Sequence, residues 1–147
     1  MKRIVFFFFL SIALNTGTIS AQADTKVTTG VVELQQGDCY QAVKTLRLAL
    51  TMVADMKPKN VPKAWFSLGD ALLCSMRKAA TEKDMEKLTE FKDAAIDAVE
   101  AYTKAKETDT EGKFTKQAEE KLSALSPAIS AAALEMVHKA KDRKSVV

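Results

Sequence analysis

The chain has 147 residues, 47% of them hydrophobic and 28% charged, so it can bury the core of one domain but is short for two. Its formal net charge is +3, and two of the positive charges belong to Lys2 and Arg3. The other basic residues alternate with acidic ones, as in the stretch EKDMEK at residues 82–87, and form no dense block. This balance argues against a nucleic acid partner and favours solvated helix faces.

Residues 1–23 have the three regions of a secretory signal peptide. These are a basic start, an apolar stretch at residues 4–14, and the small-residue cleavage site Ala21-Gln22-Ala23. A membrane anchor is the alternative, but about 18 apolar residues are needed to cross a bilayer and this stretch is shorter. We expect cleavage after Ala21 or Ala23, release into the periplasm or the outside, and no membrane span in the released protein.

The next residues predict two helices joined by a tight turn. Val27, Val31 and Leu34 mark the first helix; the second is marked by Val43, Leu46, Ala49, Leu50 and Val53. Gly37 is expected to end the first helix in the left-handed conformation. Asp38, with Gln41 three residues later, is expected to cap the second helix as a variant of the capping box.

Four more helices are expected after a proline-containing loop at residues 57–62. The third extends to about residue 79, and its apolar face comprises Trp65, Leu68, Leu72 and Leu73. Asp84 is expected to cap the fourth, which should be the longest and run to about residue 107. A turn cluster at residues 108–112 precedes a fifth at 114–125, and Ser126-Pro127 opens a sixth. No strand pattern is present, so the predicted fold class is all-α.

Small and large apolar residues recur at matching positions in two parts of the chain. The first copy has Gly30, Ala42, Leu46 and Ala49; the second has the stretch AWFSLGDAL at residues 64–72, followed by Ala98, Tyr102 and Ala105. This spacing resembles the tetratricopeptide repeat. The resemblance implies antiparallel helical hairpins stacked as a short solenoid, with repeats at residues 24–56 and 62–110 and further helices at 113–141.

The second copy departs from the family pattern. From Gly30 to Gly69 is 39 residues, whereas the usual repeat has about 34. From Ala42 to Ala98 is 56 residues, which leaves 17 extra residues near 75–92. We expect them to form a projecting hairpin, or a merely solvated extension. The proline that usually follows the second helix is missing after Thr108-Asp109.

Cys39 and Cys74 are the two cysteines of the chain, and an exported protein meets an oxidising compartment. Antiparallel neighbouring helices would bring the start of the second helix close to the end of the third, so a disulfide is possible. Each cysteine also occupies a position where the family tolerates a small buried residue. Two packed thiols are therefore the alternative.

The resemblance also implies a concave groove lined by the first helix of each pair. By motif position, the groove residues are Val27, Val31, Leu34, Gln35, Lys63, Phe66, Asp70, Leu73 and Cys74. Phe66, flanked by Lys63 and Asp70, could anchor a bound peptide. In the alternative, Phe66 packs on the first helix. The implied partner is a protein or a peptide, and the oligomeric state stays open.

Residues able to carry out catalysis are scarce. His138 is the one histidine and has no second ligand at helical spacing, so no metal site is expected. The sequence also has no phosphate-binding loop and no nucleophile motif. We therefore expect neither an enzyme nor a cofactor, but an exported scaffold or adaptor that binds a protein or peptide. The alternative is a non-catalytic spacer or capping region of a longer envelope protein.

Residues 142–147, DRKSVV, resemble the in-frame translation of a common sequencing-library adapter. On this interpretation the natural chain continues beyond residue 141, and the basic residues of the tail have no function. A genuine short basic tail is the alternative.

Overall fold

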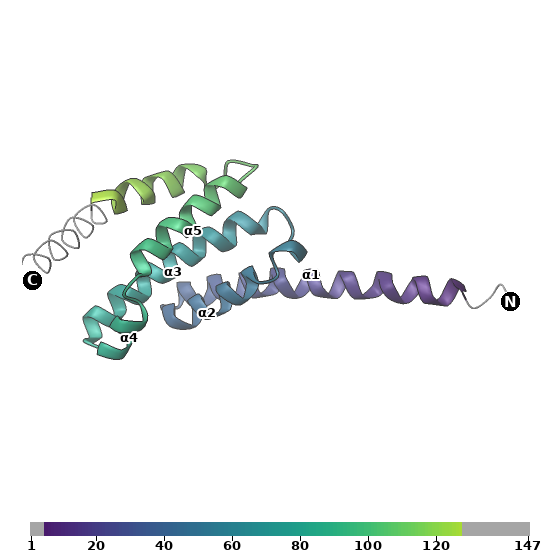
Figure 1. The fold of residues 1–147 in the computed structure, drawn as a ribbon, viewed down its shortest axis with the longest axis horizontal. Helices are drawn as coiled ribbons and strands as arrows, with labels where there is room; N and C mark the ends of the chain where they lie inside the picture. Colours follow the sequence, from purple (N-terminus) through teal and green to yellow (C-terminus); the bar gives the residue numbers. More distant parts are fainter. Residues whose placement is uncertain (1–4, 128–147) are drawn as a thin grey trace, which may run out of the picture.

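The computed structural model describes residues 5–127, and side chains from residue 20 onward. Its elements in chain order are the helices α1 (Val5–Gln35) and α2 (Cys39–Leu50), the 3₁₀ turn η1 (Val53–Asp55), and the helices α3 (Asn60–Glu82), α4 (Met85–Glu90) and α5 (Ala94–Thr108). A further helical segment covers residues 115–127 (Figure 1). Within residues 5–127 there is no strand, which confirms the all-α prediction. His138 and the tail at 142–147 lie outside the described residues.

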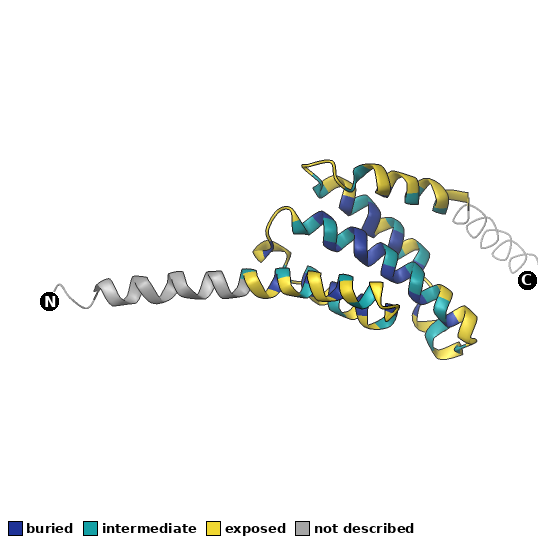
Figure 2. Ribbon diagram, turned by 180° about the vertical axis from the view of Figure 1, so that it is seen from behind, coloured by how far each residue is buried: buried dark blue, intermediate teal, exposed yellow. Residues whose placement is uncertain are grey.

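The helix α3 is the centre of the fold. It packs against α2 on one side and α5 on the other, and it also contacts α1 and α4. Buried residues concentrate on α3 and α5 and on the inner faces of α1 and α2 (Figure 2). The helices α1, α2, α3 and α5 thus form a row in which each packs on the next, and the short α4 lies against α3.

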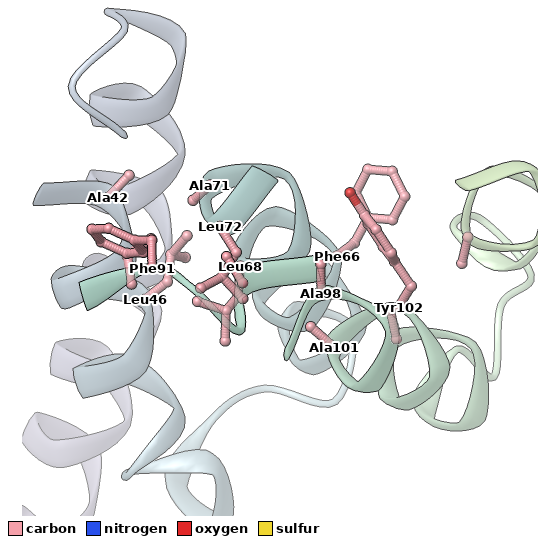
Figure 3. Packing of buried hydrophobic residues seen from close by; sticks show 14 residues of the cluster. Ala42, Leu46, Phe66, Leu68, Ala71, Leu72, Phe91, Ala98, Ala101 and Tyr102 are labelled. Carbon is pink, nitrogen blue, oxygen red and sulfur yellow. The ribbon is translucent and has the colours of Figure 1, made fainter. Parts of the chain in front are cut away.

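The main core joins α2, α3 and α5 to the segment 115–127. Tyr102, Leu46 and Leu72 are its largest fully buried side chains, and Phe66 lies beside Tyr102 (Figure 3). A smaller cluster ties α1 to the start of α3 and comprises Ala23, Val27, Ala49, Met56 and Ala64. Ala23, at the expected cleavage site, is therefore part of the packed structure.

Two glycines let neighbouring helices approach closely. A Cβ on Gly30 of α1 would lie 2.6 Å from Cγ of Leu46 on α2, and a Cβ on Gly69 of α3 would lie 2.6 Å from Cε1 of Tyr102 on α5. In both places a glycine on one helix receives a large side chain from the next helix in the fold. These are the pairs that the repeat pattern placed at matching positions.

The turn between α1 and α2 agrees only in part with the sequence prediction. Gly37 has φ +81°, as expected for a left-handed residue, and the amide of Asp38 donates to the carbonyl of Glu33 at 2.9 Å to close α1. The predicted capping box is wrong. Asp38 has ψ 64° instead of the extended conformation of a side-chain cap, and it makes no cap hydrogen bond. Gln41 instead bonds Thr45 within α2.

The predicted fourth helix is two helices, and neither is the longest. Asp84 caps α4 as expected by accepting from the amide of Lys87 at 3.0 Å. The helix α4 then ends after six residues. The turn that follows places Phe91 in the core, where its ring stacks on that of Tyr40 with the two centroids 5.5 Å apart. One continuous helix is incompatible with this turn. The 23 residues of α3 exceed the 15 of α5.

The loop before α3 is shorter than predicted, because α3 begins at Asn60. Pro62 therefore lies in the first turn of the helix, where its missing N–H has no helical partner to lose. The α1 residue Asp24 holds this start in place. Its Oδ1 accepts from the side-chain amide of Asn60 at 2.7 Å and from the backbone amide of Lys57 at 3.2 Å.

The extra residues of the second copy lengthen α3, but they do not form a free hairpin. The turn to α4 lies against the start of α2, where Tyr40 has the ammonium groups of Lys78 and Lys87 within 5.3 and 5.4 Å of its ring. Glu82 accepts a long hydrogen bond of 3.4 Å from the Tyr40 hydroxyl. The inserted segment thus braces α2 as well as extending α3.

Cys39 and Cys74 form a disulfide, with their Cα atoms 5.7 Å apart. The bond joins the first residue of α2 to the second half of α3. Of the two alternatives left open by the sequence, the structure has the bridged one.

The disulfide should stabilise the fold, since it closes a loop with a sequence separation of 35 residues. By the chain-entropy relation, reduction should lower the free energy of unfolding by about 3–4 kcal/mol. Urea unfolding followed by circular dichroism, with and without reductant, measures this difference. The double variant Cys39→Ala/Cys74→Ala should not respond to reductant, and equal midpoints for the wild-type chain in both conditions would contradict the prediction.

The contact between Gly69 and Tyr102 predicts that a glycine-to-alanine change, which usually stabilises a helix, destabilises the fold at this position. Alanine normally favours a helix by about 1 kcal/mol over glycine. At Gly69 the added methyl would overlap the buried Tyr102 ring, and overpacking costs about 1–3 kcal/mol. Gly69→Ala should therefore destabilise the fold in thermal or urea unfolding. Ala80→Gly, at an exposed position of α3, measures the effect of helix propensity alone on the free energy of unfolding. A Gly69→Ala protein more stable than the wild type would refute the packing argument.

Candidate binding groove

The binding residues predicted from the repeat pattern lie on α1 and α3, but most are already engaged in packing. Val27 and Phe66 are buried, with exposed fractions of 1% and 9%. The half-buried ones are Val31, Leu34, Lys63, Asp70, Leu73 and Cys74. Gln35 alone of the set is exposed. The structure does not gather these residues around a hollow.

Phe66 is a core residue. Its ring centroid lies 5.5 Å from that of Tyr102 on α5 and 5.6 Å from that of Phe114. The residue is therefore buried against α5 and Phe114 and is not an exposed anchor for a peptide. The sequence pattern missed this because the helical segment 115–127, with Phe114 just before it, folds back over that face of α3.

Asp70 connects three helices. Its Oδ1 accepts from the hydroxyl of Tyr102 at 2.7 Å and from the ammonium group of Lys121 at 2.6 Å. Burial, followed by the hydrogen bond to the Asp70 carboxylate, raises the pKa of the Tyr102 hydroxyl above its ordinary value. Asp70 thus serves the interior, where it satisfies the polar end of a buried tyrosine.

Asp109 fixes the start of the segment 115–127. Its Oδ2 accepts from the backbone amides of Phe114 and Thr115 at 2.6 and 2.9 Å. Partial burial raises the pKa of the Asp109 carboxyl, but these hydrogen bonds outweigh it and leave the pKa below its usual value. The turn between α5 and the segment 115–127 is therefore held by an aspartate cap.

An open groove with a largely apolar lining lies elsewhere, between α2 and α5 and over α3. It is an open hollow of about 380 Å³, lined by Arg47 and Leu50 of α2, by Thr51 directly after that helix, by Trp65, Leu68 and Leu72 of α3, and by Asp97, Glu100 and Ala101 of α5. None of the residues predicted to bind a partner lines it. We call it the Trp65 groove.

The Trp65 groove has an apolar floor and a charged rim. Leu68 and Leu72 are buried, whereas Leu50 and Trp65 are half-buried and belong to the surface of the core. At the rim, Nη2 of Arg47 lies 3.0 Å from Oδ2 of Asp97. Both side chains are about half exposed, so this ion pair adds little to stability, in general about 0–1 kcal/mol. The pair can therefore rearrange at small cost.

Lys104 completes the surroundings of the tryptophan. Its ammonium group lies 5.6 Å from the centroid of the Trp65 ring, a cation–π distance. The helical pattern predicted a packing role for Trp65, because this residue lies on the apolar face of α3. Its partial exposure depends on the separation between α2 and α5, which no local pattern encodes.

Among the residues that the structure describes, no group of histidine, cysteine, aspartate or glutamate side chains could hold a metal ion. None of the described helices is long and apolar enough to cross a membrane. Comparisons with protein-family models, curated proteins and solved structures found no match to this chain.

The hydrogen bond from the Tyr102 hydroxyl to Asp70 predicts that the stability of the fold depends on pH. The pKa of the Tyr102 hydroxyl is higher in the folded than in the unfolded chain, where it is about 10. The contribution of this group to the free energy of unfolding is therefore complete below pH 10 and is lost as the pH rises above that value. At pH 7, Tyr102→Phe should lower the free energy of unfolding by about 1–2 kcal/mol, because a hydrogen bond to a carboxylate is lost. As the pH rises above 10, this difference should shrink by up to about 1.4 kcal/mol per pH unit, so that by pH 12 the variant is at least as stable as the wild type.

Urea unfolding of both proteins at pH 7 and at alkaline pH measures this difference. A difference that is the same at pH 7 and pH 11 would show that Tyr102 is not held in its neutral form by the fold.

Proposed function

We propose that this protein is an exported helical-repeat scaffold whose Trp65 groove binds a segment of another protein or a peptide. The observation that carries the proposal is the groove itself, an open apolar hollow with a half-buried tryptophan and a charged rim. Tryptophan and arginine are the residues most enriched where protein partners contribute binding energy. A small apolar pocket with a few polar groups suits one anchoring side chain.

The proposed assignment to tetratricopeptide-like repeats is supported by the paired glycine contacts. Gly30 receives Leu46, and Gly69 receives Tyr102, in successive pairs of packed helices. Recurrent packing of this kind is what a stacked repeat requires, since each unit buries its apolar face against the next. Such stacks present extended surfaces to other proteins.

The proposed export is supported by residues 1–23 and by the cysteine pairing. The bond between Cys39 and Cys74 is of the type that persists in oxidising compartments such as the periplasm. The proposal assigns the chain a binding role and no catalytic step.

Trp65 is the one tryptophan of the chain, so its fluorescence reports directly on the groove. Peptides selected on the immobilised full-length protein from a random phage-displayed library should shift or quench this fluorescence on binding. Leu50→Asn should weaken binding of the same peptides by about tenfold, because Leu50 supplies apolar lining. Isothermal titration calorimetry gives the two dissociation constants.

The control is Leu48→Asn, which changes an exposed leucine of the same helix outside the groove. Thermal unfolding establishes that both variants are folded. The proposal fails if no selected peptide changes the Trp65 fluorescence, or if the two variants weaken binding equally.

A further inference from the structure

We infer that the bond between Cys39 and Cys74 is a thiol-exchange site, which a low-molecular-weight thiol enters at the sulfur of Cys74. Exchange would attach the thiol to α3 and release the first residue of α2. Neither cysteine lines the Trp65 groove, so this covalent site is separate from it. The inference does not depend on the proposed peptide binding.

The two cysteines of the bond are buried to different degrees. Cys39 has an exposed fraction of 1%, whereas Cys74 is half-buried. Arg77, three residues after Cys74 and therefore on the same face of α3, is exposed. The rate of thiol exchange depends on which sulfur the attacking thiolate can reach. The bond is therefore open to attack from the Cys74 side.

The surroundings of Cys39 close the other side of the bond. Its Sγ lies 3.4 Å from the carbonyl oxygen of Gly37, and the ammonium group of Lys78 lies 3.4 Å from the same oxygen. The following residue, Tyr40, stacks on Phe91 of the core. The turn after α1 and the second half of α3 thus meet around Cys39.

The position of Cys39 also favours its departure as a thiolate. It is the first residue of α2, and a negative charge at a helix N-terminus is stabilised by the helix dipole. Asp38 makes no cap hydrogen bond, so its carboxylate does not occupy the first amides of α2. The charges of Asp38 and Lys78, which flank Cys39, have opposite signs. Cys74 lies within α3 and has no such helix terminus.

The exchange proceeds in two balanced steps. The external thiolate attacks Sγ of Cys74 and forms a new S–S bond there, while the bond to Cys39 breaks and Cys39 leaves as a thiolate that takes a proton from water. A second external thiol then attacks the new bond, displaces Cys74 as a thiolate that is also protonated, and departs as the oxidised dimer. Two external thiols are oxidised, and one protein disulfide is reduced to two thiols.

Noncovalent contacts hold α2 when the bond is open. The stacking of Tyr40 on Phe91 remains at the start of the helix, and the fully buried Leu46 remains in the core. The chain is therefore expected to stay folded during exchange, so that the reaction can be followed on the native protein.

The test treats the oxidised full-length protein with reduced glutathione, stops the reaction early with acid and blocks the released thiols with N-ethylmaleimide. Trypsin places the two cysteines in different peptides, residues 27–44 for Cys39 and residues 64–77 for Cys74. Mass spectrometry without reduction should find glutathione on the Cys74 peptide at least about tenfold more often than on the Cys39 peptide. The urea-unfolded protein is the matched control, and it should lose this preference because both sulfurs are then exposed.

Glutathione found mainly on Cys39, or equally on both cysteines of the native protein, overturns the inference. The same holds if the unfolded protein forms the adduct and the native protein forms none.

The single variants Cys39→Ala and Cys74→Ala provide a second measurement, after thermal unfolding has established that they are folded. Towards a chromogenic aromatic disulfide, the Cys74 thiol of the first variant should react about tenfold faster than the Cys39 thiol of the second, because it is the more accessible. The reverse order would contradict the inference. The mapping on the wild-type chain does not require these variants to fold.

Discussion

Close approach of neighbouring helices at two glycines is the constraint on which the rest of the structure depends. Gly69 leaves room for the Tyr102 ring, and that ring then places its hydroxyl on Asp70. Because Asp70 also binds Lys121, the same contact positions the segment 115–127. A larger residue at Gly69 would push α5 outward and disturb three helices together. The fit of the Tyr102 ring against Gly69 thus specifies how α3 and α5 pack, and the hydrogen bonds of Asp70 connect this contact to the segment 115–127.

The disulfide and the inserted segment act on the second half of α3. The bond between Cys39 and Cys74 fixes the start of α2, and the stacking of Tyr40 on Phe91 holds the turn before α5 against the same end. The helix α3 is therefore held near its middle by a buried tyrosine network and, one turn further on, by a covalent bond. Beside these contacts α2 and α5 stay far enough apart to leave α3 partly uncovered, and the Trp65 groove lies there.

Helical periodicity predicted the features that depend on neighbours in sequence. The all-α class, the left-handed Gly37 and the Asp84 cap all follow from local chemistry. The errors arose where tertiary contacts decide. From periodicity alone, one helix was predicted to continue through residue 91. In the structure α4 ends before Phe91, whose ring stacks on Tyr40, a contact between distant parts of the chain that periodicity does not include. Asp38 is a favourable cap by type, but the closing turn of α1 gives it the wrong ψ.

The binding site was harder to predict than the fold, for the same reason. Position within a repeat predicted which residues share a helix face, yet it could not show that the segment 115–127 would cover Phe66 and engage Asp70. An apolar residue on the predicted face is therefore equally suited to a partner helix of the same chain and to a foreign peptide. What distinguishes Trp65 is that its own helix neighbours leave it half-covered while charged groups from α2 and α5 converge around it. Incomplete burial next to converging charged groups is a property of three helices at once, and it is the more informative sign of a docking surface.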